Sequence, residues 1–549
     1  MTTLNPISIP HIQQSIAAFL TIGDLNRCAL VDKTWNEIFT PFVYKHIYVN
    51  EDTDRWIGVP SDVASLTIPQ RHGCHVREVV IRALGSGNAQ FLARHCQSLT
   101  AVTMIHGARL QFLASLSTVV KANANIEYLN LHIDDELQKS LLCLLPLFPK
   151  LKDARLTFET AQTPNPIPDI LSSCELLEVL AIKANTLYWK KPLQPIPAGT
   201  QAPHTHHHLK ALSIHAQWSP QDINLFFANL VHTCPNISTL TIPFVDGMST
   251  LSDLCSAIQD MDIGGRPGIR ELELKSSQRT LGSEDYVDQI LKAIPPGNLR
   301  RFELTSLWVN PSSLESLVLH HSHSLRTVSL GRARSPRPVE EWSRGIQCLL
   351  TSCPNLKFLD IFSSKRHWTA PTALVALVGQ DAIRTPWVCL GLEVLRVSIV
   401  QICCPTAPQC QIASCSATEA TPRSLTWNET DVIDNSEETE RLHSCQAMQE
   451  ALFVQLGRLR SLKELWLEPL FTDRDSRIDC LQWSLKRGLR HMEHCRRLET
   501  LQISRTHHGI TVSDLQWMKE HWPRLTWASS QPFVQADLKS WVRKNWPRQ

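Results

Sequence analysis

The stretch Leu-Glu-Val-Leu-Ala-Ile at residues 177–182 decides the fold, because its pattern, Leu-x-x-Leu-x-Leu with aliphatic substitutions, recurs along the 549 residues. Most copies start about 23 to 36 residues apart, a period typical of stacked repeats rather than of separate globular domains. The clear copies start at Ile126, Leu151, Leu177, Leu209, Ile237, Ile269, Leu299, Leu325, Leu356, Leu392, Leu462 and Leu498, with weaker ones at Val76 and Leu99 and a truncated one at Leu525.

Each copy predicts a short strand, in which alternate side chains point to opposite faces. The fourth and sixth positions point into a core, and the third, fifth and seventh point outward. The stretches before the copies predict helices, as in residues 223–231 and 283–294, where apolar residues recur at helical spacing. One strand and one helix cannot bury their apolar faces alone, so the repeats are expected to stack into a curved solenoid.

The residues just before several copies contain a proline that ends the helix and turns the chain into the strand. They read Phe-Pro-Lys at 148–150, Cys-Pro-Asn at 234–236 and 353–355, and Trp-Pro-Arg at 522–524. We predict that the residue before the proline closes the core. Cysteines occupy the same place at Cys96, Cys174 and Cys495, so five of the 17 cysteines are expected to be buried packing thiols.

These repeats resemble the leucine-rich-repeat family, of the irregular kind with long strand-plus-helix units. The resemblance implies an α/β solenoid. One departure from the family pattern is that the asparagine usually found after the strand is nearly absent, with Asn185 as the best match. The usual asparagine ladder is therefore in doubt, and the curvature is expected to be irregular.

The first fifty residues lack the repeat and predict short amphipathic helices. The first helix enters through Pro10 and is broken at Gly23, Asp24 can cap the second, and Pro41 ends the last. A module of about forty residues is marginal in size and gains stability by docking an exposed apolar face on a partner.

This segment looks like an F-box. The motif appears in order as Ile9-Pro10, Phe19-Leu20, Asp24-Leu25, the stretch from Cys28 to Trp35, and Pro41-Phe42. Three positions depart from the family pattern: Ile9 replaces leucine, His11-Ile12 stands where an acidic residue is common, and Tyr44 replaces a final tryptophan. The combination with repeats looks like the F-box-like sets of filamentous fungi.

The resemblance implies a substrate-recognition subunit of an SCF-type (Skp-cullin-F-box) ubiquitin ligase, which is not itself an enzyme. The implied partners are a Skp-type adaptor, a cullin scaffold and an unidentified protein substrate. The alternative is a repeat scaffold whose F-box-like cap stays internal and never joins a ligase. The adaptor contacts implied by resemblance are Pro10, Ile12, Ile16, Leu20, Leu25 and Leu30, with Trp35 anchoring the helices.

We expect five segments: an F-box-like module at 5–49, a repeat solenoid at 70–400, a flexible insertion at 401–446, further repeats at 447–530 and a capping helix at 531–549. The outward strand positions line the face that such arrays use for binding. Aromatic or arginine side chains there have the composition of binding hot spots. The candidates for the substrate are Tyr128, Arg155, Phe358, Phe362 and Trp466.

Composition and the absence of certain motifs argue against several classes of function. Lys plus Arg total 54 against 52 for Asp plus Glu, so we expect no nucleic-acid partner held by bulk charge. No signal peptide or membrane span is evident, which predicts a cytoplasmic or nuclear protein. We expect neither a cofactor nor a metal: the spacing of Cys403, Cys404, Cys410 and Cys415 fits zinc poorly, and the histidines at 206–208 and 320–323 are expected in polar connectors.

Overall fold

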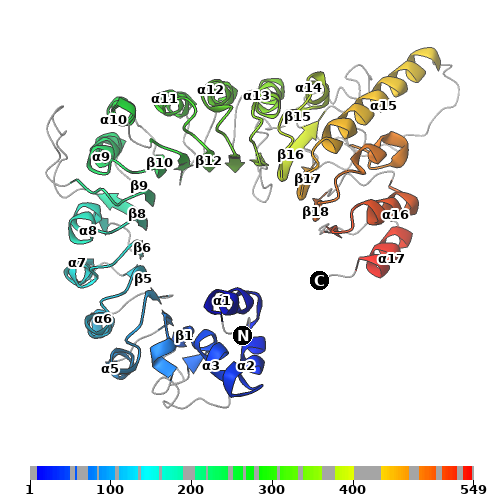
Figure 1. Ribbon diagram of the computed structural model, residues 1–549. Coiled ribbons are helices and arrows are strands. Elements are labelled where there is room, and N and C mark those ends of the chain that lie inside the picture. The colour runs from blue at the N-terminus through cyan, green and yellow to red at the C-terminus, as the bar shows by residue number, and fades with distance from the viewer. Residues whose placement is uncertain are drawn as a thin grey trace, which may run out of the picture. The chain divides into compact units, whose positions relative to one another are not determined.

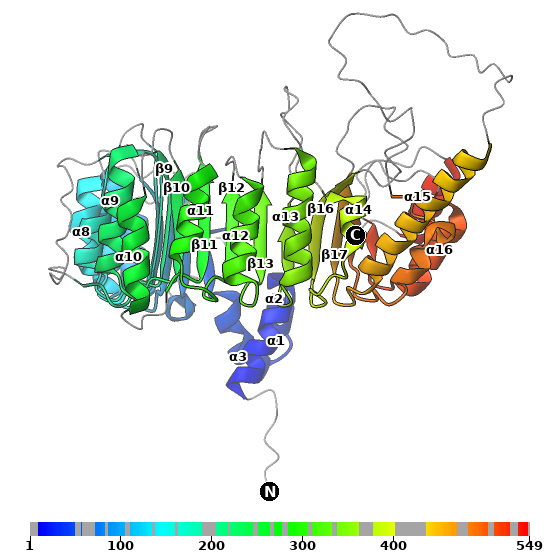
Figure 2. The same cartoon turned by 90° about the horizontal axis from the view of Figure 1, so that it is seen from above.

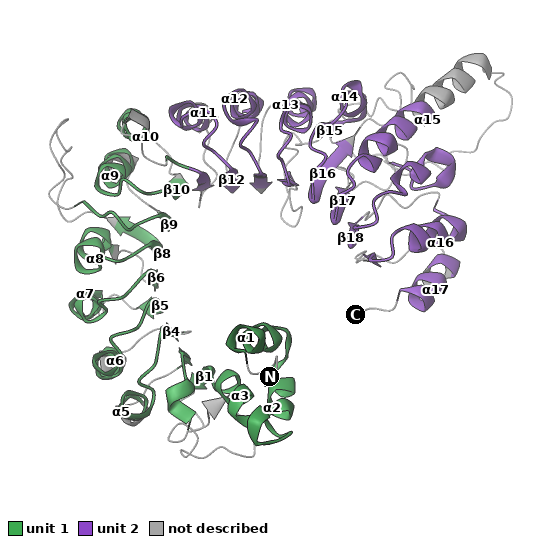
Figure 3. Cartoon of the chain, viewed as in Figure 1, with its two compact units in different colours: residues 1–269 green, residues 270–549 purple. Residues whose placement is uncertain are grey.

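The computed structural model divides by its internal contacts into unit 1, residues 1–269, and unit 2, residues 270–549, which Figure 3 colours separately. Phe362 and the four clustered cysteines at 403–415 lie outside the described residues. The structure describes residues 9–49, 56–57, 72–82, 86–104, 110–133, 138–159, 163–188, 205–217, 220–244, 251–263, 268–276, 284–305, 310–331, 338–361, 377–400, 435–468, 481–502, 510–527 and 536–546.

Unit 1 begins with three short helices and continues as alternating strands and helices (Figure 1). In order these are α1 Pro10–Phe19, α2 Ile22–Ala29, α3 Lys33–Val43, β1 His46–Val49, β2 Trp56–Ile57, η4 Gly73–His75, β3 Glu78–Ile81, α5 Ser86–His95, β4 Ala101–Met104, α6 Leu110–Ala122, β5 Tyr128–Ile133, α7 Gln138–Leu144, η6 Leu145–Leu147, β6 Asp153–Phe158, β7 Thr163–Pro164, α8 Ile167–Ser173, β8 Val179–Tyr188, β9 Ala211–Gln217, α9 Pro220–Thr233, β10 Thr239–Phe244 and α10 Ser252–Ile263.

Unit 2 repeats the same alternation, and its helices α11, α12 and α13 stand side by side in Figure 2. Its elements are β11 Glu271–Ser276, α11 Glu284–Ala293, β12 Arg301–Thr305, α12 Pro311–His321, β13 Thr327–Gly331, α13 Val339–Ser352, β14 Phe358–Asp360, β15 Leu377–Val378, α14 Gly379–Arg384, β16 Val394–Val400, α15 Asn435–Gly457, β17 Glu464–Glu468, η8 Leu485–Arg487, η9 Leu489–Met492, β18 Thr500–Gln502, α16 Val512–His521, β19 Thr526–Trp527 and α17 Ala536–Asn545.

The strands within each unit pair in parallel with their neighbours along the chain. In unit 1 the order is β1, β3, β4, β5, β6, β8, β9 and β10, and β2 runs antiparallel to β1. In unit 2 it is β11, β12, β13, β14, β16, β17, β18 and β19. Sequential parallel pairing with a helix between strands is the solenoid that the repeats predict.

The alternation of side chains along the strands follows the prediction. In β5 the outward Tyr128, Asn130 and His132 are half-exposed, while Leu129 and Leu131 are buried. The predicted helices are also present, as α9 and α11. The repeat pattern therefore fixes both the layer and the face on which each side chain lies.

In most of the described repeats, the residue three positions before the copy is buried, and these residues form a column along the repeats, whereas Pro296 is exposed and Ser322 is half-buried. The five predicted cysteines belong to it, and burial raises the pKa of Cys96, Cys174 and Cys495 to about 12, so these thiols stay protonated and inert. Asn123 is buried in the same column, where its Oδ1 accepts a hydrogen bond from the Leu99 N–H at 3.1 Å. At Asn123 the column thus joins one repeat to the next.

Several local expectations were wrong. The N-cap of α2 is Thr21 rather than Asp24, and the Asp24 N–H donates to Thr21 Oγ1 at 3.2 Å. Pro41 lies inside α3 instead of ending it. Two of the histidines assigned to polar connectors, His206 and His321, are buried in the repeat core, where ring nitrogens lie 2.9 Å from the Cys174 carbonyl and 3.4 Å from the Leu291 carbonyl.

Two segment boundaries look different in the structure. The sheet already includes β1, which pairs with β3, although its residues fall in the range assigned to the helical module. Helix α15 starts at Asn435, inside the range expected to be a flexible insertion. The C-terminal helix α17 lies within the range expected for it.

Candidate functional site

The N-terminal helical module, α1 to α3, has a small core of its own. Ala17, Leu25, Phe39 and Val43 are buried together, and the half-buried Trp35 packs on Phe39 with ring centroids 5.3 Å apart. Trp35 and Phe39 lie one turn apart on α3, and Trp35 packs against the edge of this core. At 7% exposure, Leu25 is part of this core rather than of the module surface, where a partner contact was expected.

Caps and turns set the angles between the three short helices. Thr21 begins α2, and Asp32 begins α3 by accepting the Trp35 N–H at 2.8 Å. Asn36 then donates its side-chain amide to the Ala29 carbonyl at 2.8 Å, which ties α3 to the end of α2. Such caps contribute about 1 kcal/mol each, which matters for helices of only eight to eleven residues.

The module leaves large apolar side chains in water. Phe19 is 90% exposed and Leu30 is 83% exposed, which makes them the two most exposed large apolar side chains among the described residues. Ile22 and Val31 are also exposed. Of the other predicted contacts, Pro10 is exposed, whereas Ile12, Ile16 and Leu20 are half-buried. Phe19 was not among the predicted contacts, although the Phe19-Leu20 pair of the motif was the signal for it.

On the strand face of unit 1, the predicted candidates Tyr128 and Arg155 lie together. The Arg155 guanidinium stands 5.4 Å from the Tyr128 ring centre. It also pairs with Asp153 of its own strand at 3.1 Å, and this hydrogen bond is the main reason why the pKa of Arg155 is raised. The register places Asp153 opposite Tyr128 and Arg155 opposite Asn130, which brings the ring and the ion pair side by side.

On the strand face of unit 2, Phe358 and Trp466 are joined by a residue that the sequence analysis missed. Arg396 of β16 stands with its guanidinium carbon 4.3 Å from the Trp466 ring centre and 5.9 Å from that of Phe358. It also reaches Asp360 at 3.0 Å and Glu464 at 2.8 Å. We call these five residues the Arg396 cluster.

The parallel register explains the Arg396 cluster. Asp360 of β14 is opposite Arg396, and Arg396 is opposite Trp466 of β17. The strand of Arg396 starts after Leu392, whose copy of the repeat was recognised, so reading its outward positions would have found this arginine. Stacking on rings and pairing with carboxylates order the guanidinium before any partner arrives.

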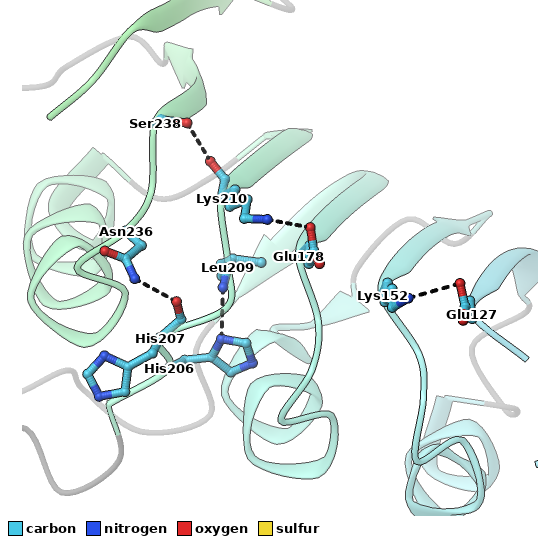
Figure 4. A network of polar contacts seen from close by, with 9 residues as sticks. All are labelled: Glu127, Lys152, Glu178, His206, His207, Leu209, Lys210, Asn236 and Ser238. Carbon is cyan, nitrogen blue, oxygen red and sulfur yellow. Dashed lines mark hydrogen bonds and ion pairs between the residues drawn. The ribbon is translucent and has the colours of Figure 1, made fainter. Parts of the chain in front are cut away.

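A second polar feature runs along the start of the strands. The residue after the first aliphatic of a repeat is hydrogen-bonded through the backbone to its counterpart in the next repeat. In unit 1 these residues are, in order, Arg77, Thr100, Glu127, Lys152, Glu178, Lys210 and Ser238. Figure 4 shows the ion pairs in this ladder, Lys152–Glu127 at 3.1 Å and Lys210–Glu178 at 2.7 Å. The hydrogen bond from Lys210 is the main cause that lowers the pKa of Glu178.

The described part of the chain holds no group of three or more His, Cys, Asp or Glu side chains that could bind a metal. None of the helices within it combines the length and apolarity that crossing a membrane requires.

No family model and no curated protein matches the chain. Solved structures do match it. One is the yeast Rad7–Elc1 complex, which matches at 13% identity with a TM-score of 0.33 and covers 68% of this chain and 98% of the other. The leucine-rich-repeat protein LegL7 from Legionella pneumophila matches at 11% identity and a TM-score of 0.31, over 58% of this chain and 90% of the other. A leucine-rich-repeat protein of Leptospira interrogans matches at 10% identity with a TM-score of 0.29. That match covers 85% of this chain and 92% of the other.

Proposed function

We propose that this chain is the substrate-recognition subunit of an SCF-type ubiquitin ligase, in which α1 to α3 bind a Skp-type adaptor and the repeats bind a protein target. The observation that carries the proposal is the exposure of Phe19 and Leu30 on a module that already has its own core. Both side chains fall within the F-box-like motif. Fully burying such a side chain contributes about 1.5–3 kcal/mol, so a partner groove that covers both would gain substantially.

In this role the chain supplies no reacting group. Its contribution to ubiquitin transfer is proximity, since the repeats hold the target while the adaptor and cullin bring a charged conjugating enzyme near a target lysine. The strand faces of the two units, with the Arg155 pair and the Arg396 cluster, present ordered aromatic and arginine side chains of the kind found at binding hot spots.

The second candidate is a repeat scaffold whose helical module serves only as an internal cap. It is favoured by the way in which the module continues into the repeats: α3 leads directly into β1 of the sheet, and the Tyr44 ring stacks on His72 with centroids 4.4 Å apart. This reading leaves Phe19 and Leu30 without a use, which is why we prefer the ligase subunit.

Capture of a purified Skp-type adaptor by the full-length chain tests the proposal. Phe19→Asp with Leu30→Asp should abolish capture while the melting temperature stays unchanged, because both side chains are exposed. The matched control is Leu319→Asp on α12, which is 78% exposed and outside the module, and it should leave capture intact. Failure of the wild-type chain to bind the adaptor, or equal capture by the double variant, would favour the scaffold.

A further inference from the structure

In unit 2, as in unit 1, the residues that follow the first aliphatic of each repeat form a backbone-linked ladder at the start of the strands. This ladder begins with a run of positive charge. The Arg300 N–H donates to the Arg270 carbonyl, the Arg326 N–H to the Arg300 carbonyl, and the Lys357 N–H to the Arg326 carbonyl, at 2.7 to 2.8 Å. These backbone bonds prove that the four residues are neighbours in successive repeats. We call Arg270, Arg300, Arg326 and Lys357 the basic column.

Elsewhere in the same ladder, charged neighbours are mostly of opposite sign, and the exception is the pair Lys45 and Arg77 at the start of unit 1. In unit 1, Lys152 and Lys210 pair with the glutamates before them (Figure 4). Beyond the basic column, Glu393 forms ion pairs with Lys357 at 3.9 Å and with Lys463 at 2.5 Å. The hydrogen bond from Lys463 is the main reason why the pKa of Glu393 is lowered. Among the described residues, the basic column is therefore the longest run of like charge in the ladder.

These three arginines are exposed, and in the described part of the chain no carboxylate lies within ion-pair distance of their side chains. Neighbouring strands are about 4.8 Å apart, so like charges stand next to one another, which destabilises a sheet. A ligand with several closely spaced negative groups would remove this repulsion.

The surroundings favour a polypeptide ligand over a nucleic acid. Glu271, Glu273 and Glu303 point outward from the strands that start at the column, so they adjoin it on the strand face. On that face Glu273 pairs with Lys275 and Glu303 pairs with Arg301, both at 2.7 Å, so its charges are mixed. A continuous polyanion lying across that face would leave the run of arginines, unpaired among the described residues, for a surface on which the cations are already paired with carboxylates. An extended peptide can place acidic residues at the column and neutral or basic residues over the glutamates. Arginine also matches carboxylates with its two-pronged geometry.

We propose that the basic column binds an acidic segment of the protein partner, rich in Asp or Glu and extended, with about one carboxylate at each arginine. This inference rests on the proposed function in that the repeats are taken to bind a protein. It adds a chemical class for the bound segment and places that segment at the start of strands β11 to β14.

The test is a fluorescence-anisotropy titration of the full-length chain with a labelled hexaglutamate peptide flanked by Gly-Ser, against the same peptide with Gln in place of Glu. The wild-type chain should bind only the acidic peptide. The triple variant Arg270→Gln, Arg300→Gln and Arg326→Gln should bind it at least about tenfold more weakly. The charge-matched control, Lys152→Gln, Lys210→Gln and Lys463→Gln, should stay within about twofold of wild type.

Equal loss in the triple variant and the control would overturn the proposal, since it would assign binding to overall charge. Tighter binding of an oligothymidylate, lost in the triple variant, would also overturn it and assign the column to single-stranded nucleic acid. Adaptor capture is measured on the same samples. If the chain captures the adaptor but the basic column does not bind the acidic peptide, this inference alone is refuted. If the peptide binds specifically but the adaptor is not captured, only the ligase role is refuted.

Discussion

Replacing Arg396 with glutamine should destabilise unit 2 by about 2 kcal/mol. The guanidinium is only 26% exposed, and its partners Asp360 and Glu464 are less exposed still. Each of the two ion pairs is worth about 0.5–1 kcal/mol at a site of this kind. Stacking on Trp466 at 4.3 Å adds about 0.5–1 kcal/mol. The sum is large for a residue on the outward face of a strand, where most substitutions are nearly neutral.

Arg301→Gln is the matched control. Arg301 is also an outward arginine at a strand, but it is 51% exposed and pairs with Glu303 of its own strand at 2.7 Å. An exposed pair of this kind contributes little, so its loss should cost below about 0.5 kcal/mol. Urea unfolding followed by circular dichroism compares the two, with the difference in midpoints converted through a shared slope.

A double-mutant cycle then assigns the effect to named contacts. Arg396→Gln combined with Glu464→Gln should show a coupling of about 1 kcal/mol, since the pair is in direct contact at 2.8 Å. If Arg396→Gln and Arg301→Gln shift the midpoint equally, or if the coupling is absent, the reasoning that the Arg396 cluster is a joined unit is refuted.

Two further substitutions test close packing and burial. Gly457→Ala should lower the free energy of unfolding by about 3 kcal/mol, because its Cβ would lie 2.0 Å from the His491 carbonyl oxygen. Gly391→Ala, with nothing within 4 Å of its Cβ, should be nearly neutral, and equal urea midpoints for the two variants would contradict this reasoning. Burial lowers the pKa of His321 to about 4, below the ordinary value of 6.5, so the stability that its neutral ring contributes above pH 6.5 should be lost as the pH falls toward 4. We expect a loss of about 2 kcal/mol between pH 7.5 and 5 that is absent from His321→Gln, and an unchanged pH slope in that variant would show that another group binds the proton.

The repeat core could be predicted from the sequence because one constraint acts many times. Leu129 and Leu131 must point inward for the same reason as Leu272 and Leu274, and all four are buried. The turn before each strand repeats as well, so its buried residue could be located without knowing its type. That is why a cysteine, a phenylalanine or an asparagine all serve there.

Local ends of helices could not be fixed in this way, because several residues compete for each cap. Thr21 and Asp24 are both good caps, and their side chains hydrogen-bond to each other at 2.6 Å. Only the backbone geometry shows that Thr21 precedes the first turn. Pro41 misled the prediction because a helix can continue past a proline at the cost of one backbone hydrogen bond.

The Arg396 cluster shows what a list of outward residues leaves out. Read one at a time, Phe358 and Trp466 are two outward aromatics, and both are half-buried. The register places one arginine between them and two carboxylates beside it. Those strands are far apart in sequence, since a long insertion separates Arg396 from Glu464. A partner that lands on these rings meets side chains whose rotamers are already restricted, so less conformational entropy is lost on binding. The cluster's own charges sum to about minus one, which favours a neutral or basic contact there, whereas the basic column favours acidic residues. Under the proposed binding role, we therefore expect the strand face of unit 2 to select for a partner segment whose charge changes along its length.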